Sequence, residues 1–163
     1  MKVTEIQLTN FQLQQLMEEF NPKLTADGIN SKYSWFLYKN CEQMMPLYNE
    51  LINKLYDERR EPEFPAWFKE NQEIITTYAD KDENGKIKEN PQGFPIITEH
   101  AEEYQMSMVE FKEKYKDFYA KLEKKPSINR EIYMQKVSFM ATMLELSEFP
   151  PTTKPFIIGL LGY

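Results

Sequence analysis

The residues of this chain whose types and spacing could do chemistry lie in one short acidic run, residues 80–91. Asp80, Asp82 and Asn84 place side-chain oxygens at the first, third and fifth positions of this run, and a glycine follows at the sixth. This is the oxygen spacing of a helix–loop–helix calcium site, in which the glycine allows a sharp turn. The twelfth position, which supplies a bidentate glutamate in such sites, is Pro91. The run indicates either a degenerate calcium-type loop or a polar hairpin tip with an Asn-Gly turn.

No other pattern in the chain is typical of a catalytic or cofactor site. Cys41 is the only cysteine and His100 the only histidine, so one chain cannot build a zinc site from these residue types. Cys41 lies in an apolar helical stripe and His100 in the first turn of an expected helix, which argues against a Cys–His nucleophilic pair. A glycine-rich phosphate loop, a Gly-x-Ser-x-Gly elbow and a Glu-x-x-His pair are all missing from the sequence. We therefore expect a protein that is not an enzyme and binds no cofactor.

Exposed apolar residues are the second candidate for function. Four aromatic residues crowd one turn of an expected helix, and they cannot all face the same way. Either some form a partner interface, or the preceding helix and the C-terminal tail cover them. The apolar tail, residues 150–163, either docks on its own core, which we favour, or binds a neighbouring molecule. The residues that we predict to bind a partner are Tyr33, Trp35, Phe36, Tyr38, Phe156, Ile157, Leu160 and Leu161.

Two long amphipathic stripes must position these residues. The first spans residues 31–60, and its apolar residues recur at spacings that alternate between four and three positions. This spacing predicts one helix bent at Pro46, or two helices as the alternative. The second runs from Ala101 to Leu122 and predicts a long helix capped by Thr98 and ended near Pro126. We expect the two helices to pack antiparallel. The first stripe comprises Leu37, Cys41, Met44, Tyr48, Leu51 and Leu55.

Shorter patterns fill the rest of the chain. Residues 3–8 alternate and predict a short strand or an extended lead-in, and Thr9 or Asn10 then caps a helix that runs to Phe20. Residues 65–79 predict a further helix. Residues 132–146 fit either a strand or a helix, and we lean towards a strand. The fold class that we predict is mainly α, possibly α+β: an antiparallel hairpin of long helices with additional short helices and a small β element.

Length and composition restrict the class of protein. A chain of 163 residues with 41% hydrophobic residues is expected to fold as a single domain. The net charge of −6 makes nucleic acid an unexpected partner, because binding a phosphate backbone needs a basic face. Neither a bilayer-spanning apolar run nor a signal peptide is present, so we expect no membrane partner and a cytoplasmic location.

The order of these features resembles small uncharacterised proteins encoded by tailed bacteriophages and prophages. The resemblance covers about residues 35–150 and is carried by the two long helices, by the acidic segment from Tyr78 to Lys86, and by the Glu/Leu/Pro-rich segment from Leu144 to Pro151. It implies a viral origin and a location in the host cytoplasm or in the virion, and it transfers no functional residues.

Together these observations predict a non-enzymatic protein-interaction or structural factor, phage-encoded, with a role in assembly, in the virion or in contact with the host. Its partner would be another protein or a second copy of the chain. The alternative is a small regulatory binding module that uses the degenerate calcium-type loop at residues 80–91.

Overall fold

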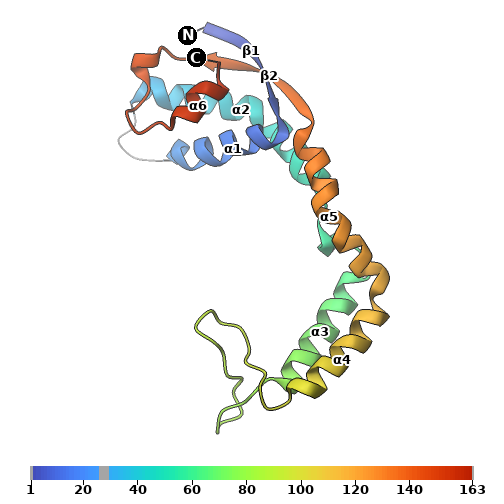
Figure 1. Ribbon diagram of the computed structural model, residues 1–163. Helices are drawn as coiled ribbons and strands as arrows, with labels where there is room; N and C mark the ends of the chain where they lie inside the picture. The colour runs from blue at the N-terminus through green and yellow to red at the C-terminus, as the bar shows by residue number, and fades with distance from the viewer. Residues whose placement is uncertain (1, 26–29, 163) are drawn as a thin grey trace. The chain divides into compact units, whose positions relative to one another are not determined.

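The computed structural model describes residues 2–25 and 30–162 of the chain. By their contacts the residues group into two compact units, where length alone predicts one domain: a first unit of Met1–Tyr56 with Pro126–Tyr163, and a second unit of Asp57–Lys125. Figure 1 shows the elements in chain order. They are β1 (Lys2–Thr9), α1 (Asn10–Phe20), η1 (Asn21–Thr25), α2 (Ser31–Lys54), η2 (Glu58–Arg60), α3 (Phe64–Tyr78), α4 (Ala101–Lys114), α5 (Lys116–Met134), β2 (Lys136–Met143), η3 (Leu146–Glu148) and α6 (Pro155–Leu160).

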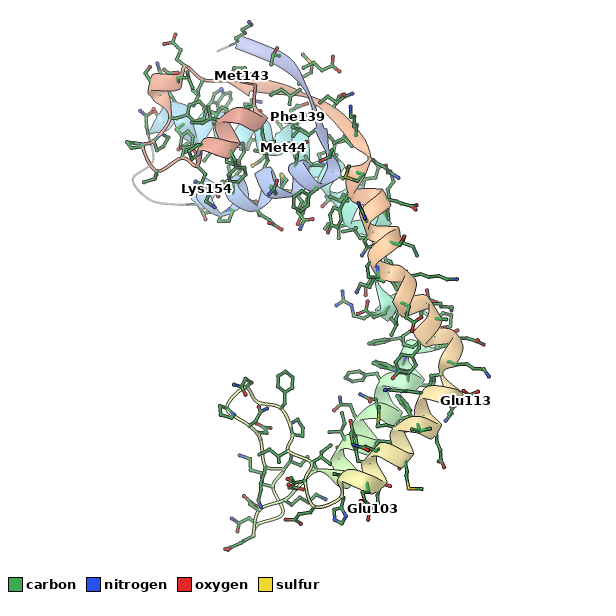
Figure 2. The ribbon with its side chains drawn as sticks, viewed as in Figure 1. Met44, Glu103, Glu113, Phe139, Met143 and Lys154 are labelled. Atoms are coloured by element: carbon green, nitrogen blue, oxygen red, sulfur yellow. The ribbon has the colours of Figure 1, made fainter. Side chains whose placement is uncertain are left out.

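The predicted fold class is confirmed, because the described residues form mainly helices and one small two-stranded sheet. In the first unit β1 pairs with β2 in antiparallel register, with Ile6 opposite Phe139. α2 packs against both α1 and β2. Met44 on α2 and Phe139 on β2 lie in the core between these elements (Figure 2). The strand that we favoured within residues 132–146 is therefore present as β2.

Local chemistry explains where the first helices begin. Thr9 caps α1 with a full capping box, in which its hydroxyl accepts from the Gln12 N–H and the Gln12 side chain accepts from the Thr9 N–H. α2 is capped by Asn30, whose side chain accepts from the Lys32 N–H. Pro46 lies inside α2 on the exposed side, so its missing N–H leaves a carbonyl facing water and the helix stays in one piece.

The expected end of this helix near residue 61 is wrong, since α2 ends at Lys54. Leu55 adopts an extended conformation, with φ −60° and ψ 137°. The side-chain oxygen of Asn129 on α5 accepts the Tyr56 N–H at 2.8 Å, which holds the chain where it leaves the helix. A hydrogen bond between residues so far apart in the chain has no signature in the local sequence. The apolar spacing, which continues to Leu55, therefore does not show where the helix ends.

The second unit is a helical hairpin, but its partners differ from those that the stripes predict. α4 packs on α3 within this unit, where the stripes predict α2 as its partner, and in the first unit α2 packs with α1 and β2. Trp67 on α3 contacts the rings of Phe111 and Phe118, with centroid distances of 6.2 and 5.3 Å. Phe111 and Phe118 are the most deeply buried side chains among the described residues of this unit, so their contacts with Trp67 form the centre of its apolar core.

The second long helix also differs from its predicted bounds. The stripe is divided at Tyr115 into α4 and α5, and α4 is preceded by His100 where Thr98 was the expected cap. Pro126 does not end the helix, since α5 continues through it to Met134. The proline is exposed, and a proline within a helix removes one main-chain hydrogen bond without ending α5 here. The division between the two units falls at this proline.

The tail docks on its own core, as favoured from the sequence. α6 follows a proline-rich segment, and Ile157 and Leu161 are buried with the core residues of the first unit. Among the described residues, no helix combines the length and the apolar character needed to cross a membrane.

Candidate functional site

The acidic run at residues 80–91 forms a polar hairpin whose side-chain oxygens bind the protein's own backbone. Gly85 stands at the turn with φ 77°, in the left-handed region that favours glycine. The Asp82 carboxylate accepts from the N–H groups of Asn84 and Lys86 at 2.9 Å each. An antiparallel bridge between Lys81 and Ile87 closes this turn, and a second bridge, between Glu89 and Pro95, closes a further turn at Gly93. The residues thus form the hairpin tip that the Asn-Gly pair predicts.

Asp80 closes this hairpin onto the segment that leads into α4. Its carboxylate accepts from the backbone N–H groups of Thr98 and Glu99 at 3.1 Å each, and from the Thr98 hydroxyl at 2.5 Å. These donors, the hydroxyl first, lower the pKa of the buried Asp80 carboxyl below its ordinary value. Asp80, Asp82 and Asn84 were the predicted metal ligands, and the oxygens of the two aspartates are turned to these internal donors. In the part of the chain that the structure describes, no group of three or more potential metal-ligating residues converges.

Cys41 and His100 lie in different units and in different environments. Cys41 is buried in the core of the first unit, and burial raises the pKa of its thiol to about 11. His100 is exposed just before α4. A thiol that is protonated at neutral pH and screened from solvent is a structural residue and a poor nucleophile.

The predicted aromatic cluster is split by the helix that carries it. Tyr33 and Phe36 point into the core, where the two rings stack at 5.7 Å and Phe36 also meets Phe20 and Phe149 edge-on. This placement removes both from any surface that a partner could reach. It follows from helix geometry, because these positions share the angular phase of Leu37, Cys41 and Met44 on the buried face of α2.

Trp35 and Tyr38 form the exposed half of the cluster, which we call the α2 aromatic pair. The two side chains are 51% and 50% exposed, and their rings stack at a centroid distance of 5.9 Å. The Lys39 ammonium lies 5.0 Å from the Trp35 ring centroid and 5.6 Å from that of Tyr38, within cation–π range. Glu42 in turn accepts a 2.9 Å hydrogen bond from Lys39. The pair is therefore held in place before any partner binds.

The predicted tail residues divide in the same way. Ile157 and Leu161 are buried in the core, and Leu160 packs partly against it. Phe156 is the exposed member, with the Lys154 ammonium 6.0 Å from its ring centroid. The four predicted residues that fill the core, Tyr33, Phe36, Ile157 and Leu161, leave the α2 aromatic pair as the largest exposed part of the predicted surface.

Asn40 ties α2 to the sheet, although it was not predicted from the sequence as a candidate residue. Its side-chain amide, fully buried, donates to the carbonyl of Thr142 at 2.9 Å and accepts from the Thr142 N–H at 3.0 Å. The amide also donates to the Phe36 carbonyl at 2.9 Å. The signal was present in the sequence, because Asn40 is a polar residue three positions after Leu37 and four before Met44, in the phase of the buried stripe.

Comparison of the chain with protein-family models, with curated proteins and with solved structures finds no match.

Proposed function

We propose that the protein is a non-enzymatic interaction factor that binds another protein through the α2 aromatic pair. The observation that carries the proposal is the exposure of two large stacked rings, Trp35 and Tyr38, on the side of α2 that faces away from its core residues. Tryptophan and tyrosine are enriched among the residues that dominate binding energy, because each buries a large apolar area at a small cost in side-chain entropy.

The surroundings of the pair support the same role. Lys39 is fixed over both rings, so the surface offers an apolar platform with one cation at its margin. The rings are already stacked, which lowers the entropy that binding has to remove. A partner suited to this platform has a shallow apolar recess rimmed by a carboxylate or by carbonyl oxygens.

We further propose, from the resemblance to small proteins of tailed bacteriophages and prophages, that the gene is of phage origin. The partner is then a phage protein or a bacterial host protein, and the site of action is the host cytoplasm or the virion. An assembly or accessory role fits a protein whose candidate surface is a contact platform.

The test is a comparison of three immobilised proteins in extracts of phage-infected bacteria. The wild type is compared with Trp35→Ala and with Asn49→Ala, a control on the exposed side of the same helix about four turns away. A protein that the wild type and Asn49→Ala both retain, and that Trp35→Ala loses, supports the proposal. Equal retention of every protein by all three contradicts it.

A further inference from the structure

The two strands of the sheet present different outer edges. In an antiparallel pair, residues alternate between those that bond to the partner strand and those whose N–H and C=O point away from it. Thr142 makes both of its main-chain bonds to Asn40, so the pair of Thr142 and Val3 is one that points away. The Asn10 N–H bonds to the Gln135 carbonyl, which continues the same alternation at the far end of the ladder. Val3, Glu5 and Gln7 therefore direct their backbone groups to the outer edge of β1.

This outer edge of β1 is open. Within the described residues, no hydrogen bond is made by the outward N–H or C=O groups of Val3, Glu5 and Gln7. The next outward N–H, that of Thr9, donates a hydrogen bond to the side-chain oxygen of Gln12. On β2 the matching edge is shortened, because Asn40 occupies both groups of Thr142. The edge of β1 also lacks a proline and a bulge, devices that proteins commonly use to block strand addition.

A groove borders β1 and the end of β2. It has a volume of about 1060 Å³, and the residues that line it are Lys2, Thr4, Glu5, Ile6 and Gln7 of β1, Met143, Leu144 and Glu145 at the end of β2, Lys32, Glu148, and Leu160, Leu161 and Gly162. An added strand places alternate side chains on the two faces of the sheet, so half of them would enter this groove. The open main-chain groups and the groove together fit an extended segment.

We propose that a second copy of this chain adds its β1 to the open edge of β1, which makes a four-stranded antiparallel sheet across a two-fold axis. A two-fold axis requires each copy to use the same edge, and β1 offers the longer one. This inference concerns a surface other than the α2 aromatic pair and does not depend on the proposed function.

The side chains of β1 disfavour a two-fold axis at Glu5 and suit one at Ile6. An axis at Glu5 would set two carboxylates directly opposite each other, which destabilises a sheet. An axis at Ile6 sets Glu5 of each copy opposite Gln7 of the other, so that each Gln7 amide donates to a carboxylate on the solvent-facing side. The two Ile6 side chains then meet on the opposite face of the sheet, the face that packs on the core of each first unit. Glu5 and Gln7 pair through the main chain as well, with four N–H to C=O bonds in all across the axis.

The main experiment measures solution mass by light scattering over about a hundredfold range of protein concentration. Glu5→Pro removes one outward N–H and leaves the bonds of Thr4 and Ile6 to β2 in place. Ser138→Pro makes the matched change on the outer edge of β2, since Ser138 is opposite Gln7 and points away from β1. The wild type and Ser138→Pro are expected to reach twice the monomer mass, and Glu5→Pro to stay monomeric.

Substitutions at Gln7 test the register without a proline. Gln7→Glu faces Glu5 of the second copy with a like charge and is expected to weaken the dimer roughly tenfold, and Gln7→Lys to strengthen it by a similar factor. Circular dichroism of each variant shows whether the fold is kept. The proposal is overturned if the wild type is monomeric throughout, if Glu5→Pro dimerises like the wild type, or if the two Gln7 variants behave alike.

Discussion

Asn40 on α2 completes the hydrogen bonding of Thr142 on β2 through both its amide nitrogen and its amide oxygen, at 2.9 and 3.0 Å. A side-chain amide offers one donor and one acceptor in the same geometry as a peptide group. Asn40 thus takes the place of a third strand at this point and ties the helix to the sheet. One buried polar residue thus adds directed hydrogen bonds to the apolar packing of α2 on β2, and it shortens the open edge of β2.

Replacing Asn40 should destabilise the first unit. Asn40→Ala leaves the N–H and C=O of Thr142 without their partner, and we expect a loss of about 2–3 kcal/mol in the free energy of unfolding. Urea unfolding followed by circular dichroism measures this loss. Asn49→Ala, an exposed change on the same helix, should stay within about 0.5 kcal/mol of the wild type. Similar values for the two variants would show that the Asn40 bonds contribute little.

Trp35 and Phe36 are neighbours in sequence, and their replacements should have opposite consequences for stability. Phe36→Ala removes a fully buried ring from the core and should cost about 3–5 kcal/mol. Trp35→Ala removes an exposed ring and should change the free energy of unfolding by at most about 0.5 kcal/mol. Denaturant titrations of both variants give the comparison. A large loss in Trp35→Ala would mean that its ring stabilises the fold and is not a separable surface.

The Cys41 thiol should be unreactive in the folded protein. Its pKa is raised to about 11 by burial, so at neutral pH almost none is present as the reactive thiolate, and the side chain is only 3% exposed. Alkylation at pH 7 should be slow in buffer and become complete once urea unfolds the chain. The rate in buffer then reports how often the core opens. Alkylation at equal rates in both conditions would contradict the buried placement.

The hydrogen bonds of Asp80 predict an acid-sensitive hairpin. Because the folded-state pKa of Asp80 is lowered by donors from Thr98 and Glu99, its contribution to stability is complete above the ordinary aspartate pKa of about 3.9. The contribution is lost as the pH falls through the folded-state value. Thermal unfolding should therefore show Asp80→Asn to be less stable than the wild type at pH 6, with a difference that shrinks below about pH 4. Glu83→Gln removes an exposed charge at the same tip and serves as the control.

Local patterns were sufficient to predict several elements of the fold. Alternation predicted a strand or an extended segment where β1 lies, and a cap at Thr9 or Asn10 predicted the start of α1. The Asn-Gly pair predicted the hairpin after Asp80. Each of these depends on neighbours in sequence, which is the information that periodicity and capping rules contain. The strand β2 was favoured by alternation over the helical spacing of the same residues.

Features that depend on distant residues could not be predicted. The end of α2 is set by Asn129, and the pairing of α3 with α4 by Trp67, both far away in sequence from the residues that they hold. The candidate surface shows the same limit. Crowding of four aromatic residues within six positions of a helix indicated that some must be exposed, but the phase of the buried stripe was needed to separate Trp35 from Phe36.

The central claim is that Trp35 contacts another protein, and photo-crosslinking tests it most directly. A photoreactive phenylalanine analogue at position 35, and in a second variant at position 49, would be irradiated in infected bacterial cells. We predict a discrete adduct of higher mass from position 35 and none from position 49, with mass spectrometry giving the partner. Equal adducts from the two positions, or none from position 35 while the protein is folded, would contradict the claim.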